Sequence, residues 1–279
     1  MHYGITAPNF GEDSHPRLLA ALAHEAEAAG WDGFFLWDHI TWPGQVPVAA
    51  PWVVLAAMAQ HTERLRLGPL VTAPPRRRPW KLARETVTLD HLSGGRLILG
   101  VGLGFWQQEE LEALGEAGDP QRRAAQLDEG LAVLTGLWSG TPFSYTGTQY
   151  QVHNVCFLPP PVQPPRIPIW VAGCWPNKAP LRRAAQWDGV YPISRDPFHS
   201  PPLTPSAIEE IVAYVKAHRA REAPFEVVRA GQPPGKDSAE DAAVVAPYAE
   251  AGVTWWLEPA SRRAPADMRE RIRRGPPRP

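Results

Sequence analysis

The sequence predicts an α/β chain that folds as a (β/α)8 barrel. Short apolar runs typical of buried strands alternate with longer segments of helical period, and the alternation repeats eight times along the 279 residues. Barrels of this class commonly have about 250 residues, so the length suits one closed barrel. An open, doubly wound sheet is the competing arrangement, but eight consecutive units favour closure. We therefore expect a single domain over residues 1–279.

The predicted strands are short apolar runs bounded by turn-forming or polar residues. The fourth begins with Leu97, Ile98 and Leu99, directly after a turn rich in glycine. The eight predicted strands are residues 3–8, 33–37, 65–72, 97–101, 168–172, 189–193, 225–229 and 253–257.

The predicted helices carry apolar residues at helical spacing and recognisable ends. Gly30 suits the position after the first helix, Pro51 suits the first turn of the second, and Ser93-Gly94-Gly95 stops the third. The eight main helices are expected at residues 18–29, 52–62, 80–92, 121–138, 180–186, 205–221, 239–251 and 266–273, with a short one at 109–114.

One irregular excursion and a terminal tail depart from this alternation. Residues 139–165 contain a predicted hairpin at 143–152 and a Pro-rich stretch at 158–165. The strand that follows resumes the alternation, so we interpret the excursion as part of the same domain. The Pro-rich tail after the last helix is expected to be frayed.

Composition excludes several classes of function. A net charge of -1 and a pI near 6.8 give no basic excess for binding nucleic acid or an anionic membrane. Two cysteines, Cys156 and Cys174, are too few for a disulfide framework or a zinc site, so a reduced, cytoplasmic protein is expected. Neither a signal peptide nor an apolar run of about 20 residues is found.

The run from Leu97 to Gly104 predicts a strand with glycine on one face. Side chains alternate along a strand, so Gly100, Gly102 and Gly104 point the same way and leave a slot in which a flat group can lie. The alternative is a bulge or a tight corner of the barrel. The run is not the dinucleotide-binding fingerprint, because Phe105 stands where that pattern needs glycine.

The chemistry of such barrels sits at the carboxyl ends of the strands, and this rule selects a short set of residues. Aromatic residues there can clamp a planar ring, while Asn177 and Lys178, at the start of a helix, can hold a phosphate. A histidine at a strand end is a catalyst or a structural residue, and the arginine run 76–78 most often forms a solvated loop. The selected residues are Asp38, His39, Trp42, Val71, Thr72, Ala73, Gly173, Cys174, Asn177 and Lys178.

Several motifs, in order, resemble the bacterial luciferase-like monooxygenase superfamily. They run through most of the chain, and the ordered set is more specific than any one motif. The motifs are Trp37-Asp38-His39, Gly68-Pro69-Leu70-Val71-Thr72, residues 90–104, Val162-Gln163-Pro164-Pro165, residues 168–173 and Trp187-Asp188-Gly189.

The resemblance implies a luciferase-like TIM barrel that binds reduced FMN or the deazaflavin coenzyme F420 at its mouth. It implies a bulge near Val71-Thr72-Ala73, often with a non-prolyl cis peptide, that supports one face of the ring. The glycines of the fourth strand would border the ring or its ribityl chain, and residues 173–178 would reach the phosphate. The family also commonly forms homodimers.

The Asp38-His39 pair resembles the deazaflavin-dependent branch, so F420 is favoured over FMN. In the dehydrogenases of that branch the histidine takes the proton of the substrate hydroxyl, and Asp38 would orient His39 or cap the next helix. The branch also places an acid where this chain has Phe105; Glu109 and Glu110 come about one turn later, too far along to be expected at the site.

We therefore expect an oxidoreductase that transfers hydride between F420 or FMN and a small organic substrate. One alternative is a two-component FMN-dependent monooxygenase that uses reduced flavin and oxygen. In either case a flavin or F420 reductase is a candidate partner. Another alternative is a non-catalytic flavin-binding protein. A metal-dependent hydrolase would need histidines and carboxylates at several strand ends, so no metal site is expected.

Overall fold

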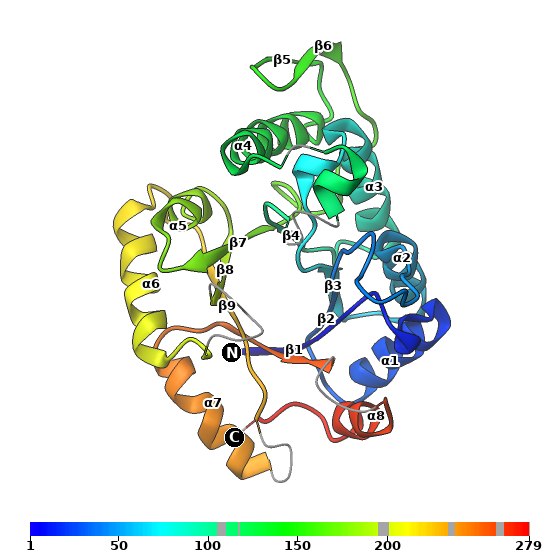
Figure 1. Cartoon of the computed structure of the whole chain (residues 1–279), viewed down its shortest axis with the longest axis vertical. Helices are drawn as coiled ribbons and strands as arrows, with labels where there is room; N and C mark the ends of the chain where they lie inside the picture. Colours follow the sequence, from blue (N-terminus) through cyan, green and yellow to red (C-terminus); the bar gives the residue numbers. More distant parts are fainter. Residues whose placement is uncertain (105–109, 117, 195–200, 234–237, 261–264, 279) are drawn as a thin grey trace.

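Eight parallel strands form the barrel, and the helices lie outside it (Figure 1), which confirms the predicted fold class. The computed structural model describes residues 1–104, 110–116, 118–194, 201–233, 238–260 and 265–278. The parallel strands are β1 (His2–Ala7), β2 (Gly33–Leu36), β3 (Arg66–Pro69), β4 (Leu99–Val101), β7 (Ile169–Trp175), β8 (Gly189–Ser194), β9 (Glu226–Ala230) and β10 (Trp255–Pro259). Around the sheet they run in the order β3-β2-β1-β10-β9-β8-β7-β4.

The ring closes between β3 and β4 through two isolated parallel bridges. Leu67 pairs with Leu97 below a break in β3, and Thr72 pairs with Val101 above it. The Leu70-Val71 peptide is cis and lies within this break, next to the predicted position. Strand β3 therefore ends at Pro69, three residues before the predicted end.

The helices follow the predicted positions to within three residues. Several begin with a proline at the first turn, where a missing backbone N–H costs no helical hydrogen bond. The helices are α1 (Pro16–Ala28), α2 (Pro51–His61), α3 (Pro79–Leu92), α4 (Pro120–Leu137), α5 (Lys178–Ala184), α6 (Pro205–His218), α7 (Ser238–Glu250) and α8 (Pro265–Arg273). Single 3₁₀ turns lie at Glu12–Ser14, Pro74–Arg76 and Glu112–Leu114.

Bulky aromatic residues fill the inside of the barrel. Phe35, Trp170 and Trp255 pack with ring centroids 5.3–5.7 Å apart. Gly33 makes room for them, because a Cβ there would lie 2.8 Å from Phe35 Cε2 and 2.9 Å from Trp255 Cζ3. The rest of the inner cluster is aliphatic: Leu70, Ile98, Val228 and Leu257.

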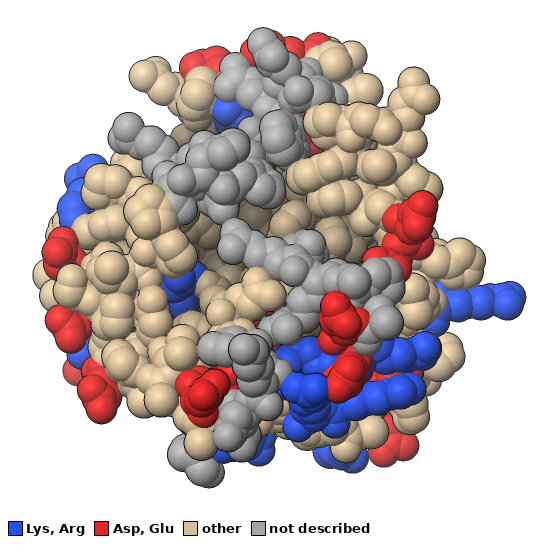
Figure 2. Space-filling model, turned by 60° about the horizontal axis from the view of Figure 1, so that its bottom comes forward, with Lys and Arg blue, Asp and Glu red and all other residues tan. Residues whose placement is uncertain are grey.

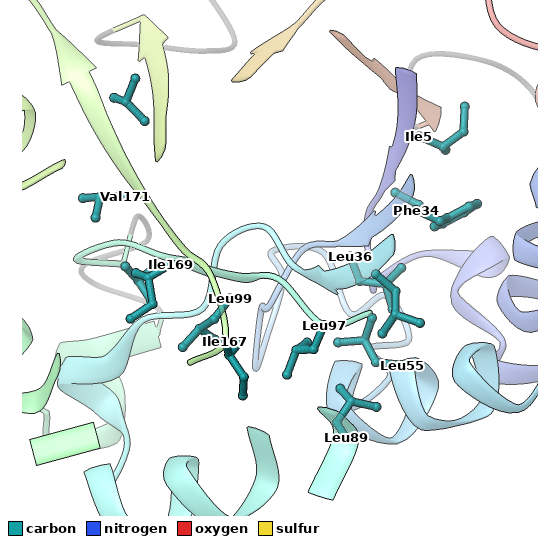
Figure 3. Packing of buried hydrophobic residues seen from close by; sticks show 14 of the residues in the cluster. Ile5, Phe34, Leu36, Leu55, Leu89, Leu97, Leu99, Ile167, Ile169 and Val171 are labelled. Atoms are coloured by element: carbon teal, nitrogen blue, oxygen red, sulfur yellow. The ribbon is translucent and has the colours of Figure 1, made fainter. Parts of the chain in front are cut away.

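A second apolar layer lies between the strands and the helices (Figure 3). Neighbouring strand residues alternate between the two layers: Phe34 belongs to the outer layer and Phe35 to the inner one. Leu36, Leu97 and Leu99 lie in the outer layer with Leu55 and Leu89 of the helices. This alternation fixes which residues face the inside of the barrel.

The excursion after α4 forms the predicted hairpin and is tied back to the helices. Strands β5 (Phe143–Thr146) and β6 (Gln151–Val155) pair antiparallel. The Glu129 carboxylate of α4 accepts hydrogen bonds from three successive backbone N–H groups in the hairpin turn. Asp90 of α3 accepts hydrogen bonds from the backbone N–H groups of Val162 and Gln163 in the Pro-rich stretch.

The expectation of a frayed tail is wrong for residues 275–278. Arg278 donates hydrogen bonds to both oxygens of Asp32 at 2.9 and 3.0 Å and to the Gly30 carbonyl at 2.9 Å. Arg271 donates to the Gly275 carbonyl at 2.6 Å. Hydrogen bonds to α8 and to the turn after α1 therefore anchor the tail, which its proline-rich composition did not reveal.

Figure 2 shows one face of the molecule, on which lysine and arginine side chains gather at the lower right with acidic side chains among them. The charges seen there are mixed in sign, in keeping with the near-zero net charge of the chain. No helix within the described ranges is long and apolar enough to cross a membrane.

Replacing Gly68 by alanine tests the β3–β4 closure. A Cβ at Gly68 would lie 1.8 Å from the backbone carbonyl oxygen of Ile98, so one of the two strands must move. We expect Gly68→Ala to lower the free energy of unfolding by about 3 kcal/mol or more, measured by urea denaturation.

Gly130→Ala is the matched control. A Cβ at Gly130, within α4, would have only ordinary contacts at 3.7 and 3.8 Å, and alanine favours the helix. A Gly68→Ala protein as stable as Gly130→Ala would show that the closure tolerates a wider spacing.

Candidate active site

The candidate site lies where the first four strands end. Asp38 and His39 follow β2, Thr72 to Arg77 follow β3, and Glu110 belongs to the segment after β4. Because β1, β2 and β3 are neighbours and β4 closes onto β3, residues far apart in sequence meet at this part of the rim.

A buried ion-pair network begins at Asp38. Arg76 Nη2 lies 3.1 Å from Oδ1, Arg77 Nη2 lies 2.8 Å from Oδ2, and the Thr72 hydroxyl donates to Oδ2. The Asp38 side chain is 1% exposed. Burial raises the pKa of Asp38, but Arg77, Arg76 and Thr72 outweigh it, so the pKa lies below its ordinary value and the carboxylate is ionised at neutral pH.

The same network reaches Glu110 through Arg76. Arg76 Nη1 lies 2.8 Å from Glu110 Oε2, and the two side chains are 2% and 1% exposed. Glu110 Oε1 accepts a hydrogen bond of 2.6 Å from the Ile40 backbone N–H. Burial raises the pKa of Glu110, but His39, Arg76 and the Ile40 N–H outweigh it, so the pKa lies below its ordinary value.

The backbone of His39 is fixed by Asn9. The amide group of this fully buried side chain accepts from His39 N at 3.1 Å and donates to His39 O at 2.8 Å. It also donates to the Ala49 carbonyl at 2.8 Å. Both backbone polar groups of His39 are therefore paired with one residue that follows β1.

The ring of His39 is enclosed by aromatic rings and one carboxylate. Phe10, Trp37 and Trp42 lie 5.6, 6.1 and 5.0 Å away between centroids, each at a steep angle to the imidazole. Phe10 and Trp42 stack on each other at 3.5 Å. Nδ1 lies 3.2 Å from Glu110 Oε1, and the side chain keeps 14% of its surface exposed.

Two sequence-based expectations about acidic residues are wrong. The carboxylate of Asp38 is held by Arg76, Arg77 and Thr72, so it neither orients the His39 ring nor caps a helix. Glu110, expected to lie too far along the chain, reaches the ring. Phe105 and Glu109 lie outside the described residues.

The arginine run is also more ordered than predicted. The Arg76 side chain is 2% exposed and that of Arg77 is 22% exposed, so neither lies on a solvated loop. Only Arg78 is exposed, with its guanidinium 6.0 Å from the centre of the Trp80 ring. The carboxylates that pair with Arg76 and Arg77 follow other strands, which explains why the run alone did not reveal them.

The space left by the glycines is occupied by the chain itself. A Cβ at Gly100 would lie 2.5 Å from the Pro69 carbonyl oxygen, and one at Gly102 would lie 3.0 Å from Val71 Cγ2. Gly104 has φ of +90° and lies beside Ala73. The three glycines do face one side, but that side is the segment 69–73, so close approach of two strands describes them better than an open slot.

The residues of the third strand end have separate positions. Val71 packs against the inner cluster, Thr72 belongs to the ion-pair network, and Ala73 lies 3.4 Å from the position of a Cβ at Gly104. Of the predicted set, the structure thus brings Thr72, Asp38, His39 and Trp42 together.

The residues at the end of β7 and the start of α5 form a separate group on the rim, because β3 and β4 lie between β7 and β2. A Cβ at Gly173 would point at Pro180 of α5, and Asn177 Oδ1 accepts from Ala179 N at 3.1 Å as the cap of that helix. Lys178 Nζ lies 3.8 Å from the centre of the Trp175 ring. Cys174 is a partly buried residue of β7. In the part of the chain described here, no three His, Cys, Asp or Glu residues are grouped as metal ligands.

Asn9, Phe10, Arg76 and Glu110 were missed as site residues. A signal for the first three existed, since β1 and β3 flank β2 in the predicted barrel, so residues that end them must neighbour His39. Glu110 had no such signal, because its position depends on the path of the segment after β4.

Comparison with known proteins identifies similar chains. A profile described as luciferase-like monooxygenase matches residues 1–275. An F420-dependent glucose-6-phosphate dehydrogenase of Intrasporangium calvum is 35% identical over 180 residues, 61% of this chain and 51% of that protein. The chain thus spans about half the length of such relatives. An uncharacterised protein of Mycobacterium tuberculosis is 33% identical over 216 residues, 70% of this chain and 73% of that one.

Solved structures share the fold at lower identity. An F420-dependent secondary alcohol dehydrogenase has a TM-score of 0.80 at 17% identity and covers 98% of this chain and 96% of its own. A coenzyme F420-dependent tetrahydromethanopterin reductase from Methanopyrus kandleri has a TM-score of 0.75 at 19% identity, with the same coverage.

Arg76→Met tests the ion-pair network. It would leave two buried carboxylates without their shared cation, and we expect a loss of about 3–5 kcal/mol in the free energy of unfolding at pH 7. Arg274→Met removes an exposed pair with Glu270 and is expected to cost less than about 1 kcal/mol.

The loss should also depend on pH. Asp38 and Glu110 have lowered pKa values, so the stability they contribute is present above their unfolded pKa values of about 4 and is lost as the pH falls further. We expect the difference between wild type and Arg76→Met to shrink as the pH falls from about 4 to about 2 in urea denaturation. A constant difference over this range would contradict the assigned ion pairs.

Proposed function

Since the chain belongs to the luciferase-like monooxygenase family, we propose that it is an F420-dependent oxidoreductase that moves hydride between the coenzyme and a small organic substrate. The observation that carries the proposal is the position of His39. Its imidazole is partly exposed at the barrel rim, and Nδ1 lies 3.2 Å from the buried carboxylate of Glu110. The names of two relatives that are 35% identical to this chain over 180 and 186 residues favour F420 over FMN.

Small residues at the β3, β4 and β7 positions of the barrel fit a planar coenzyme. Val71, Gly102 and Ala172 come from three neighbouring strands, and a Cβ at Gly102 would lie 3.0 and 3.8 Å from the side chains of the other two. Such small groups form an apolar surface against which a tricyclic ring can lie. The deazaflavin, when bound, supplies the hydride acceptor or donor.

His39 would move the proton that accompanies the hydride. A neutral imidazole accepts the proton of a substrate hydroxyl during oxidation and returns it during reduction. The stacked rings of Phe10 and Trp42 would cover one side of the substrate and keep water away from it. Lys178 and Asn177, with Gly173 and Cys174, are proposed to hold the phosphate side of the coenzyme.

The cellular setting is also a proposal. We propose a cytoplasmic homodimer that takes its reduced coenzyme from a separate reductase, with no nucleic acid or membrane as partner. Gel filtration with light scattering tests the homodimer directly, because a single chain has a mass of 30.8 kDa.

Titration with F420 and, separately, with FMN tests the choice of coenzyme. We expect F420 to bind with a Kd in the micromolar range or tighter and to quench tryptophan fluorescence, and FMN to bind at least about tenfold more weakly. Tighter binding of FMN would favour the FMN-dependent monooxygenase. Tight F420 binding without turnover on any alcohol or carbonyl substrate would favour a non-catalytic coenzyme-binding protein.

Replacing His39 by alanine tests the proton transfer. We expect turnover to fall by about 10²- to 10⁴-fold, with coenzyme affinity changed much less, because the base acts on the substrate. His153→Ala removes an exposed histidine of the hairpin and should leave turnover unchanged. Full turnover by His39→Ala would remove His39 from the mechanism.

A further inference from the structure

Of the two ring nitrogens of His39, Nδ1 has a polar side chain close to it among the described residues, that of Glu110. Nδ1 has no well-aligned hydrogen bond, yet Glu110 Oε1 lies 3.2 Å from it. The other contacts of the ring are with Phe10, Trp37 and Trp42, none of which offers a carboxylate. Among the described residues, Nε2 has no hydrogen-bond partner.

We propose that Glu110 is the positioning residue of His39: its carboxylate holds the ring proton on Nδ1 and thereby leaves Nε2 as the proton acceptor. The inference rests on the proposed function for the role of Nε2, but the contact itself is independent of it. Catalytic hydrogen bonds are often poorly aligned without substrate, and a small rotation of the ring would align this one.

The position of Glu110 is fixed from two sides. Arg76 holds Oε2 at 2.8 Å, and the Ile40 N–H holds Oε1 at 2.6 Å. Ile40 follows His39 directly, so the carboxylate is bound to the same stretch of backbone that carries the imidazole. The rotation of Glu110 and the placement of His39 are therefore coupled.

The charges around Glu110 keep it an acceptor. Arg76 is the cation that faces it, and the second carboxylate of the network, Asp38, is neutralised by Arg76 and Arg77 together. An ionised carboxylate beside Nδ1 also stabilises the imidazolium that forms when Nε2 takes a proton. Glu110 thus both selects the tautomer and supports the charged product of the transfer.

The tautomer can be measured without coenzyme. Long-range ¹H–¹⁵N spectra of protein labelled in its histidine rings show which nitrogen carries the proton, and His39→Asn assigns the signal. At a pH where the imidazole is neutral, we expect the proton on Nδ1 in wild type and a larger share of it on Nε2 in Glu110→Gln, where one end of the side chain becomes an NH2 group that cannot accept. A wild-type proton on Nε2 overturns the proposal, and this result needs no variant that folds.

Turnover gives the second measurement. With bound F420 and substrate, Glu110→Gln should lower kcat by about 10- to 100-fold, with KM for the coenzyme changed less than about threefold. Asp128→Asn removes a carboxylate that binds Arg183 on the outer helices, and should change neither the tautomer nor kcat. An unchanged kcat in Glu110→Gln overturns the positioning role.

The two proposals fail in different ways. If His39→Ala keeps full turnover while the tautomer changes in Glu110→Gln, the base assignment fails and the structural coupling stands. If His39→Ala loses turnover but the tautomer of Glu110→Gln equals that of wild type, the proposed function stands and the role of Glu110 is wrong.

Discussion

The guanidinium of Arg76 is the constraint on which the rest of the site depends. It lies between the carboxylates of Asp38 and Glu110, and all three side chains are at most 2% exposed. Transferring three charges from water into a protein costs several kcal/mol for each, so the group is tolerated only because every charge has an opposite partner. Arg77 supplies the second positive charge and leaves the network balanced.

This network joins the three segments that follow β2, β3 and β4. Asp38 follows β2, Arg76 follows β3, and Glu110 belongs to the segment after β4. The β3–β4 seam has only two isolated bridges at its ends, with the cis Leu70-Val71 peptide between them. Ion pairs at the rim therefore fix the geometry where backbone pairing is interrupted.

The fold could be predicted because its signals are local. Alternation of apolar runs, helix-ending glycines and proline-rich starts each act within about ten residues, and they placed every strand and main helix. The glycine run shows where local reasoning stops. It specified that Gly100, Gly102 and Gly104 share a side, but the neighbour on that side, residues 69–73, comes from another strand.

The site was harder because adjacency in sequence misleads at the end of a strand. Asp38 is bonded to His39 along the chain, yet its carboxylate contacts Arg76 and Arg77 instead of the imidazole. Glu110 is 71 residues away and contacts the ring. The pKa of Asp38 is lowered by Arg77, Arg76 and Thr72, and that of Glu110 by His39, Arg76 and the Ile40 N–H. The Asp38 carboxylate is thus closed off by arginines, whereas Glu110 keeps an oxygen beside Nδ1. Position around the barrel, more than position along the chain, thus decides which acid acts with the histidine.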